Sequence, residues 1–488
     1  MTSEAARPPS PYSLIFTASI VTSPTMNTIL HLGLGSFHRA HQAVYIHQLH
    51  QQGDNRWSIT GGNLRPDMLE TIEALQAQQG RYTLETVTPQ GERTYTRIES
   101  IQRVIAYQED LAPLIAVGAD PATRIISFTV TEAGYYLDDK NQLDWETFPD
   151  LRGDLTAVQS GLAGHTIYGG LVSILRARMA ANAGPVTLMN CDNLRHNGER
   201  SRGGLLQFID ALGDEQLKQW VLENTRSPNA MVDRITPRPT PDVFERVKEA
   251  TGWDDRAAIM GESFIQWVIE DNFIAGRPEW EKVGVEMVNS VQAYEEAKIR
   301  LLNATHSCIA WAGTLVGYQY IHEGTQDPVI RQMAYDYVTD DAIPVLLPCP
   351  IDLEKYRDVV LDRFANPAIQ DTNQRVAMDA FSKIPGMIAP TIRDRLAQGG
   401  SFDSVAVLPA LFLAYLHRWH LGEIPYTYQD QAMDAAAAHA ICEASDTVAA
   451  YAADETLWGE MASHPQLVDA LRAADERVQA FVSQHAKT

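Results

Sequence analysis

The sequence predicts an α/β protein, in which a Rossmann-type, doubly wound sheet domain is followed by an all-helical domain. Short apolar runs alternate with helical patterns over the first half of the 488 residues, which is typical of a mainly parallel sheet. The first of these runs ends in a glycine turn, and strand patterns disappear after residue 290. At about 150 residues per domain, the length suits two or three such units. We therefore expect a sheet domain over residues 26–285 and a helical domain over residues 286–488.

The elements follow from local patterns. Apolar or β-branched runs predict strands, and apolar positions three to four residues apart predict helices. Pro66 opens one helix, because a proline is tolerated at the first helical position. The turn Pro89-Gln90-Gly91 separates two alternating runs and predicts a β-hairpin. In chain order the sheet domain should contain a strand at 29–32, a helix at 38–52, a strand at 57–60, a helix at 66–75, hairpin strands at 82–87 and 95–101, a strand at 124–131, a helix at 167–180 and a strand at 186–190. The helical domain should contain helices at 294–314, 329–340, 353–363, 369–381 and 392–398 and an Ala-rich stretch through Tyr451.

The charge balance excludes several classes of partner. The net charge is −23, from 39 Lys and Arg against 62 Asp and Glu. Nucleic acids and anionic membrane surfaces both attract basic faces, so we expect neither as a partner. No apolar run reaches the ~20 residues of a membrane helix. The four cysteines stand singly, which predicts a reducing, cytoplasmic location; they are Cys191, Cys308, Cys349 and Cys442.

The first residues form a segment of their own. Residues 12–21 are briefly apolar after Arg7, and a signal peptide is one interpretation. The simpler interpretation is that Met26 is the native start and that residues 1–25 are an upstream extension.

The turn Gly33-Leu34-Gly35-Ser36-Phe37-His38-Arg39 follows a strand and opens a helix. This is the context of a dinucleotide-binding turn, in which the second glycine lets the backbone approach a pyrophosphate at the helix N-terminus. His38 takes the third glycine position, so a plain tight turn is the alternative. No acid stands at the tip of the second strand, where a ribose-binding carboxylate is usual. Asn63 or Asp67 could bind the ribose, and Arg65 could accept a 2′-phosphate, so spacing alone leaves NAD and NADP both open.

The helix predicted at 294–314 carries four polar side chains of different chemistry. At about 100° per residue and with Lys298 at zero, Glu295 lies at about +60°, His306 at about +80° and Asn303 at about +140°. A lysine with a reference pKa of ~10.4 loses its proton more readily when buried. Lys298 could then serve as a base for an alcohol proton near neutral pH. The alternative is a solvated amphipathic face, since these residue types are common on surfaces.

Three further polar clusters stand in unusual places. Asn190–Asn193 and Thr131–Tyr135 end predicted strands, and Met231–Pro237 places an acid and an arginine between apolar residues. Ligands bind at the carboxyl edge of parallel sheets. Each cluster alone could be a hydrogen-bonded turn, but the position of several at strand ends indicates a common cleft.

Together these motifs resemble the polyol-specific long-chain dehydrogenase family, the mannitol dehydrogenase group. The resemblance covers nearly all of the chain from Ile29. It depends on Gly33-x-Gly35-x-Phe37-His38-Arg39-Ala40-His41, Thr131-Glu132-x-Gly134-Tyr135, Cys191-Asp192-Asn193, Met231–Pro237 and Lys298-x4-Asn303-x2-His306.

The resemblance implies a role for each matching residue. Lys298 would be the general base in polyol oxidation and the acid in ketose reduction. Asn193 and Asn303 would form an oxyanion hole. His306 would bind substrate near the reacting carbon, and Glu295 would control the water path to the lysine. Three residues, Asp233, Arg375 and Lys383, would bind substrate hydroxyls.

The resemblance also implies a nicotinamide cofactor, NAD with NADP not excluded, and no metal. The sequence lacks the zinc motif H-E-x-x-H and any cysteine-rich lobe. The predicted cofactor-binding residues are Gly33, Gly35, Phe37, His38, Arg39, Asn63, Asp67, Thr131 and Glu132.

Within the family, the glycine turn and Gly62-Asn63-Leu64-Arg65 are most similar to members that interconvert D-arabinitol and D-xylulose with NAD. The alternatives are mannitol 2-oxidation, reduction of a hexuronate, for which Arg195 or Arg234 would supply the cation, and a dinucleotide-sensing protein without catalysis. The partner should be a small polyol or ketose. The oligomeric state and the physiological direction do not follow from the sequence.

Overall fold

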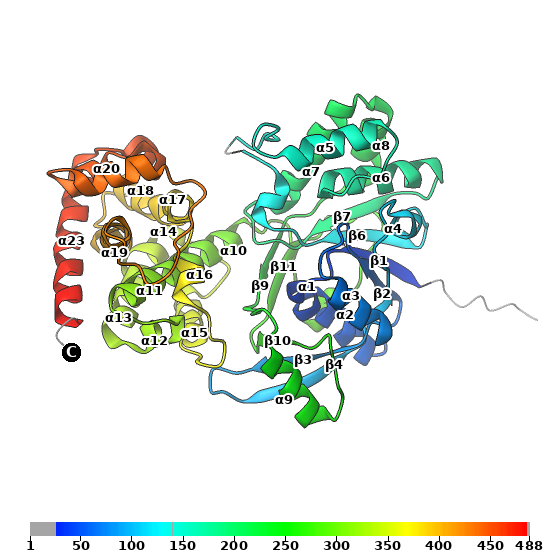
Figure 1. The fold of residues 1–488 in the computed structure, drawn as a ribbon, viewed down its shortest axis with the longest axis horizontal. Coiled ribbons are helices and arrows are strands. Elements are labelled where there is room, and N and C mark those ends of the chain that lie inside the picture. The colour runs from blue at the N-terminus through cyan, green and yellow to red at the C-terminus, as the bar shows by residue number, and fades with distance from the viewer. Residues whose placement is uncertain (1–25, 139, 486–488) are drawn as a thin grey trace, which may run out of the picture.

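The computed structural model describes residues 26–138 and 140–485, as two bodies joined through the segment around α10 (Gln292–Ala297) (Figure 1). The predicted extension at residues 1–25 lies outside the described residues. The first body contains the sheets and the second contains helices, so the predicted fold class is confirmed.

A six-stranded parallel sheet forms the centre of the first body. Its order is β5-β2-β1-β6-β7-β8, and every neighbouring pair is parallel. The strands are β1 (Asn27–Leu32), β2 (Trp57–Gly62), β5 (Ile101–Val104), β6 (Thr123–Phe128), β7 (Val186–Asn190) and β8 (Thr225–Arg226). The chain starts in the middle at β1 and β2 and later returns to the other side through β6. Both faces of the sheet are therefore covered by connecting helices, as in a doubly wound fold.

Alternation along β1 separates two cores. Ile29 packs in one cluster with side chains of α2, whereas Leu30 and Leu32 pack in another with side chains of α6. Successive strand residues point to opposite faces, so an apolar strand is needed to serve both. The connecting helices are α1 (Ser36–Ala40), α2 (Gln42–Gln51), α3 (Leu69–Ala77), α4 (Ala112–Gly118), α5 (Pro149–Gln159), α6 (Ile167–Ala180), α7 (Asn197–Leu212) and α8 (Glu215–Asn224).

Two three-stranded sheets extend this body toward the second one (Figure 1). One has the order β10-β3-β4 and the other the order β12-β11-β9. Their strands are β3 (Tyr82–Val87), β4 (Arg93–Ile98), β9 (Ala230–Asp233), β10 (Ile259–Glu262), β11 (Gln266–Glu270) and β12 (Glu286–Val288), with α9 (Pro241–Thr251) beside the first. Because β12 pairs with β11, strand structure continues past residue 285.

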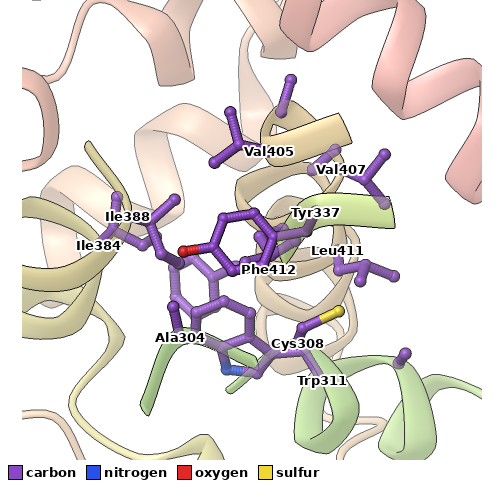
Figure 2. Packing of buried hydrophobic residues seen from close by; sticks show 14 of the residues in the cluster. Ala304, Cys308, Trp311, Tyr337, Ile384, Ile388, Val405, Val407, Leu411 and Phe412 are labelled. Carbon is purple, nitrogen blue, oxygen red and sulfur yellow. The ribbon is translucent and has the colours of Figure 1, made fainter. Parts of the chain in front are cut away.

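The second body is built on one large apolar cluster. Figure 2 shows its centre, where Trp311, Tyr337 and Phe412 gather between helices. Trp311 and Phe412 are fully buried with ring centroids 5.2 Å apart. The α-helices are α11 (Ala304–Leu315), α12 (Ile321–Gln326), α13 (Pro328–Asp336), α14 (Ile343–Leu346), α15 (Leu353–Phe364), α16 (Asn373–Ala377), α17 (Ala380–Lys383), α18 (Ala389–Ala397), α19 (Asp403–His420), α20 (Ala435–Glu443), α21 (Thr447–Ala452), α22 (Glu455–Trp458) and α23 (Pro465–His485). Three π-helical segments interrupt them, η3 (Lys298–Asn303), η4 (Tyr337–Ala342) and η5 (Ile384–Ile388).

Several predicted elements were wrong in detail. The single helix at 38–52 breaks at His41 (φ −127°, ψ −90°) into α1 and α2, where the His41 ring bonds to Gln266 O at 2.7 Å. The helix after Pro66 begins only at Leu69. The second hairpin strand ends at Ile98, and Ile101 starts β5 in the main sheet.

Candidate active site

A cleft of about 1230 Å³ opens between the two bodies. It is lined from the sheet side by the ends of β6, β7 and β9, and from the helical side by η3, α11 and the segment from 368 to 387. Ten of the predicted site residues line it: Phe37, Thr131, Asn193, Asp233, Glu295, Lys298, Asn303, His306, Arg375 and Lys383. The structure thus brings together in one cleft residues from widely separated parts of the chain.

Lys298 lies at the centre of this cleft and is only 7% exposed. Its Nζ donates to Asn193 Oδ1 at 2.5 Å and to Val232 O at 2.7 Å. Burial lowers the pKa of Lys298, and the nearby Asp233 carboxylate opposes that change. A buried amine with a lowered pKa, aimed by two acceptors, suits proton transfer.

Glu295 lies one turn before Lys298 and is 4% exposed. Its Oε1 accepts the backbone N–H of His196 at 3.1 Å, whereas its Oε2 is buried without a hydrogen-bond partner. Burial raises the pKa of Glu295. A buried carboxylate oxygen with free hydrogen-bonding capacity beside an amine is suited to pass a proton.

The helix that carries these residues is not a uniform α-helix. The predicted helix at 294–314 is α10, the π-helix η3 and α11 in succession. A π-helix bonds residue i to residue i+5, so Lys298 and Asn303 lie one turn apart. Both residues line the cleft.

The far end of the cleft holds a second polar group. His306 Nε2 lies 3.1 Å from Asp371 Oδ2, and the His306 ring stacks on Phe364 with centroids 4.2 Å apart. Arg375 also binds Asp371, through Nε at 2.6 Å and Nη2 at 2.5 Å. Lys383 Nζ donates to Val376 O at 2.6 Å, and burial lowers its pKa to about 8.

Asp233 is held by Arg363, an arginine of α15 that comes from the other body. Arg363 donates to both oxygens of Asp233, at 2.8 and 2.9 Å, and to both oxygens of Glu262, at 2.9 and 2.6 Å. The predicted role of Asp233 toward a substrate hydroxyl stays a prediction, because its oxygens contact this guanidinium.

The glycine turn has the shape that a dinucleotide needs. Gly33 has φ +103°, and a Cβ there would lie 3.0 Å from Thr129 O. At Gly35, directly before α1, a Cβ would meet nothing within 4 Å. The backbone is therefore open where a pyrophosphate would approach the N–H groups. Phe37 of α1, which directly follows this turn, and Thr131, which follows β6, both line the cleft, so these residues fit a bound dinucleotide.

Several predicted cofactor residues point elsewhere. His38 is buried and stacks on His31 at 3.4 Å, and the Arg39 guanidinium donates to Ala257 O at 2.6 Å. Asn63 accepts Leu34 N at 2.9 Å and donates to Asp67 O at 3.2 Å, so it holds the turn against β2. Asp67 is exposed. The side chain of Glu132 lies outside the part of the molecule that the structure describes.

Sequence reasoning missed Asp371, Arg363 and Glu262. Asp371 and Glu262 belong to none of the sequence motifs described above, and Arg363 lies at the end of a predicted helix of mixed charge. Only the fold brings Arg363 across to β9 and β10. The burial of these three charged side chains marks them as part of the site, and burial is a property of the folded chain that the sequence does not display.

Two features are absent from the described residues, a metal-binding group and a membrane-spanning helix. No three His, Cys, Asp or Glu side chains in this part of the chain are placed to hold a metal ion. None of its helices is both long and apolar enough to cross a membrane.

Comparisons with known proteins agree with this arrangement. The family model described as the mannitol dehydrogenase Rossmann domain matches residues 27–282, and that of the mannitol dehydrogenase C-terminal domain matches residues 290–479. The chain is 58% identical over 466 residues to a D-arabinitol 4-dehydrogenase of Ralstonia nicotianae, covering 95% of this chain and 98% of the relative. It is 55% identical to a D-arabinitol 4-dehydrogenase of Klebsiella pneumoniae, covering 91% and 96%.

Two solved structures are similar over 95% of both chains. They are Pseudomonas fluorescens mannitol 2-dehydrogenase in a ternary complex with NAD and D-mannitol (34% identity, TM-score 0.80) and a substrate-free D-sorbitol dehydrogenase (31% identity, TM-score 0.84). The two-body fold, the shared cleft and these matches lead to one conclusion: the chain belongs to the mannitol dehydrogenase family.

Proposed function

We propose that this protein is an NAD-dependent polyol dehydrogenase that oxidises D-arabinitol to D-xylulose, with Lys298 as the general base. The observation that carries the proposal is the buried Lys298 amine, held by Asn193 Oδ1 and Val232 O in a cleft that both bodies line. The choice of polyol rests on the relatives with 58% and 55% identity.

The chemistry divides between the chain and the cofactor. Bound NAD supplies the acceptor for the hydride that leaves the carbinol carbon. Lys298 Nζ takes the proton of the same hydroxyl group, and in the reverse direction returns it to the ketone oxygen. Glu295, whose Oε2 is buried and unpartnered, passes that proton between Lys298 and water.

Two amides hold the reacting oxygen. Asn193, which follows β7, accepts a hydrogen bond from the Lys298 amine, and Asn303, at the end of the π-helix, lines the same cleft. Their side-chain N–H groups can donate to an alkoxide as it forms, and such donors stabilise the transition state most where water is excluded.

The far end of the cleft binds the rest of the polyol. His306, Arg375 and Lys383 offer donors there, and Asp371 keeps His306 and Arg375 in position. A chain of hydroxyls can bond to several such donors, whereas a hydrophobic alcohol cannot.

The surroundings of Arg65 support NAD over NADP. Its Nη2 donates to Tyr136 Oη at 2.6 Å and to Asp150 Oδ2 at 3.0 Å. The charge that would bind a 2′-phosphate is thus partly compensated within the chain.

The test is a substrate panel followed by one variant. Initial rates of NAD and NADP reduction are measured with D-arabinitol, D-mannitol and D-sorbitol. The highest kcat/KM is expected with NAD and D-arabinitol. Lys298→Ala should lose about 100- to 10,000-fold in kcat, the usual contribution of a general base, and should retain NADH binding.

Lys282→Ala is the matched control, because Lys282 is an exposed lysine that pairs with Glu279 at 2.7 Å. It should keep wild-type rates. Near-normal oxidation by Lys298→Ala would refute the base assignment. Faster turnover of D-mannitol than of D-arabinitol would refute the substrate assignment, and the absence of turnover with every polyol would refute the enzyme itself.

A further inference from the structure

Arg363 connects the two bodies through a buried cluster of charges. It stands near the end of α15 in the helical body, and its guanidinium reaches Asp233 on β9 and Glu262 on β10 in the sheet body. All three side chains are almost fully buried, with exposed fractions of 2%, 6% and 4%. The guanidinium also lies 4.0 Å from the centroid of the Phe264 ring.

The hydrogen bonds of this cluster match three charged groups, and Arg363 opposes the effect of burial, which raises the pKa of Glu262. Four guanidinium N–H bonds divide evenly between the two carboxylates. Glu262 Oε1 accepts a further N–H from Ile235 at 2.6 Å. An ionised carboxylate accepts at both oxygens, whereas a protonated carboxyl group would place an O–H against these N–H donors. One positive and two negative charges leave the cluster with a net charge of −1.

This cluster adjoins the amine of Lys298. Lys298 Nζ donates to Val232 O, the carbonyl directly before Asp233. A fixed Asp233 therefore fixes the acceptor that aims the amine. When protonated, Lys298 also cancels the remaining negative charge of the cluster.

We propose that Arg363 is a positioning residue for Lys298: it fixes Asp233 and the Val232 carbonyl, and it offsets two carboxylates so that Lys298 gives up its proton readily. This inference rests on the proposed role of Lys298. In this role Arg363 acts through Asp233 and the Val232 carbonyl and does not need to touch the substrate.

The electrostatic surroundings of Lys298 are compatible with this role. Asp233 on β9 and Glu295 on α10 favour the ammonium form, and Arg363 on α15 opposes it. His41, between α1 and α2, also feels this charge, but burial lowers its pKa to about 3, so it is neutral. Arg234 and Tyr356 are the other ionisable groups beside the carboxylates of the cluster. Arg234 is bound to Glu262 O at 2.9 Å and to Ala40 O at 2.7 Å, and burial holds Tyr356 in its neutral form by raising its pKa.

Two variants should shift the titration of Lys298 in opposite directions. Arg363→Gln removes the positive charge and leaves both carboxylates, so the pKa of Lys298 should rise by about one unit, the low end of the range for a neighbouring charge. Glu262→Gln removes one negative charge, so the pKa should fall. Arg363→Lys keeps the charge without the planar fork, and it should restore most of the wild-type value.

The test has two independent measurements. The first is the pH profile of kcat/KM for D-arabinitol oxidation. The second is the pH-dependent acetylation of Lys298 by acetic anhydride, followed by peptide mass spectrometry, which reports the lysine pKa without turnover. Thermal melting identifies any variant that does not fold. Arg331→Gln is the matched control, since Arg331 pairs with Asp362 at the surface at 3.0 Å.

The outcomes separate the two proposals. Opposite shifts in Arg363→Gln and Glu262→Gln, with the control unchanged, support the inference. Lower kcat with unchanged pH profiles, or shifts of the same sign in both variants, overturn it and leave Arg363 a structural link. If the wild type turns over no polyol, the proposed function fails, and the acetylation titration still decides whether Arg363 controls Lys298.

Discussion

Replacing Asp371 by asparagine should weaken substrate binding more than the chemical step. The Asp371 carboxylate contacts two groups of the cleft, the His306 ring at 3.1 Å and the Arg375 guanidinium at 2.6 and 2.5 Å. Asparagine keeps the shape but loses the charge and one acceptor. Arg375 is then free to leave the cleft, and His306 loses its partner.

The magnitude follows from the exposure of the two contacts. The Arg375 side chain is 63% exposed, so its ion pair is worth only about 0.5–1 kcal/mol. The His306 contact is mostly buried, and a hydrogen bond to a charged group contributes about 1.5–3 kcal/mol, of which asparagine retains part. A loss of about 1.4–2.8 kcal/mol corresponds to a fall of about 10- to 100-fold in kcat/KM.

Steady-state kinetics with D-arabinitol at saturating NAD measure this loss. A higher KM with kcat changed less than about threefold is expected, because contacts at the far end of the polyol act in the ground state and the transition state alike. Asp362→Asn on α15 is the control, since that carboxylate is 65% exposed. A change in kcat/KM below about threefold, or a loss entirely in kcat, would show that Asp371 does not organise the binding end.

Three more predictions concern the Lys298 amine and the glycine turn. Oxidation requires the free amine of Lys298, so the oxidation rate should rise with pH through a pKa below the usual ~10.4, because burial lowers that pKa. Ketose reduction requires the ammonium form, so its rate should fall over the same pH range. Two pH profiles that change in the same direction would contradict the assignment. Gly33→Ala should lower the free energy of unfolding by about 1–3 kcal/mol, and therefore the melting temperature, because Gly33 has φ +103° and a Cβ would crowd Thr129 O. Gly35→Ala should have the melting temperature of the wild type, since Gly35 has φ −74° and open space around it. It should bind NADH more weakly in a fluorescence titration, and an unchanged NADH affinity would contradict binding of the pyrophosphate at this turn.

The sheet body was predicted well where one local pattern decided the structure. The bounds of β7 and α6 agree with prediction, because a short run with Val186, Leu188 and Met189 and a Thr-capped helix are complete local signals. The helix at 38–52 failed at His41, whose ring is drawn to Gln266 O from a strand more than two hundred residues away. No pattern near His41 contains that partner.

The helical body was predicted less well, because its longest helices were not recognised. α19 contains Pro409 in its interior and is buried almost throughout, and α23 packs along it. A helix buried on all sides lacks the apolar stripe on which periodicity depends. Its partner α23 does carry an apolar stripe at helical spacing, and that local signal was missed; the stripe consists of Leu467, Leu471, Ala474, Val478 and Phe481.

At the site, the sequence identified most of the cleft residues that carry the chemistry but not what holds them. The polar clusters that follow β6 and β7 converge because these parallel strands share one carboxyl edge. The cluster on β9 does not follow from this rule, because β9 lies in a separate sheet and pairs antiparallel with β11. His38 and Arg39 sit in the same motif as Gly33 and Gly35, yet they face the core. A motif does not distinguish residues that face a ligand from residues that support the turn behind it.

The π-helix shows how far contacts beyond the local sequence decide the geometry of the site. Counted at the α-helical 100° per residue, Asn303 stands well to the side of Lys298, whereas the i→i+5 bonding of η3 stacks one above the other. This wider turn must be compensated from outside the helix. Tyr337 Oη donates to Arg300 O at 2.6 Å, and the Arg300 guanidinium binds Asp394 at 2.5 Å. Both partners lie far along the chain, on η4 and α18, so the spacing of Lys298 and Asn303 depends on how the helical body is packed.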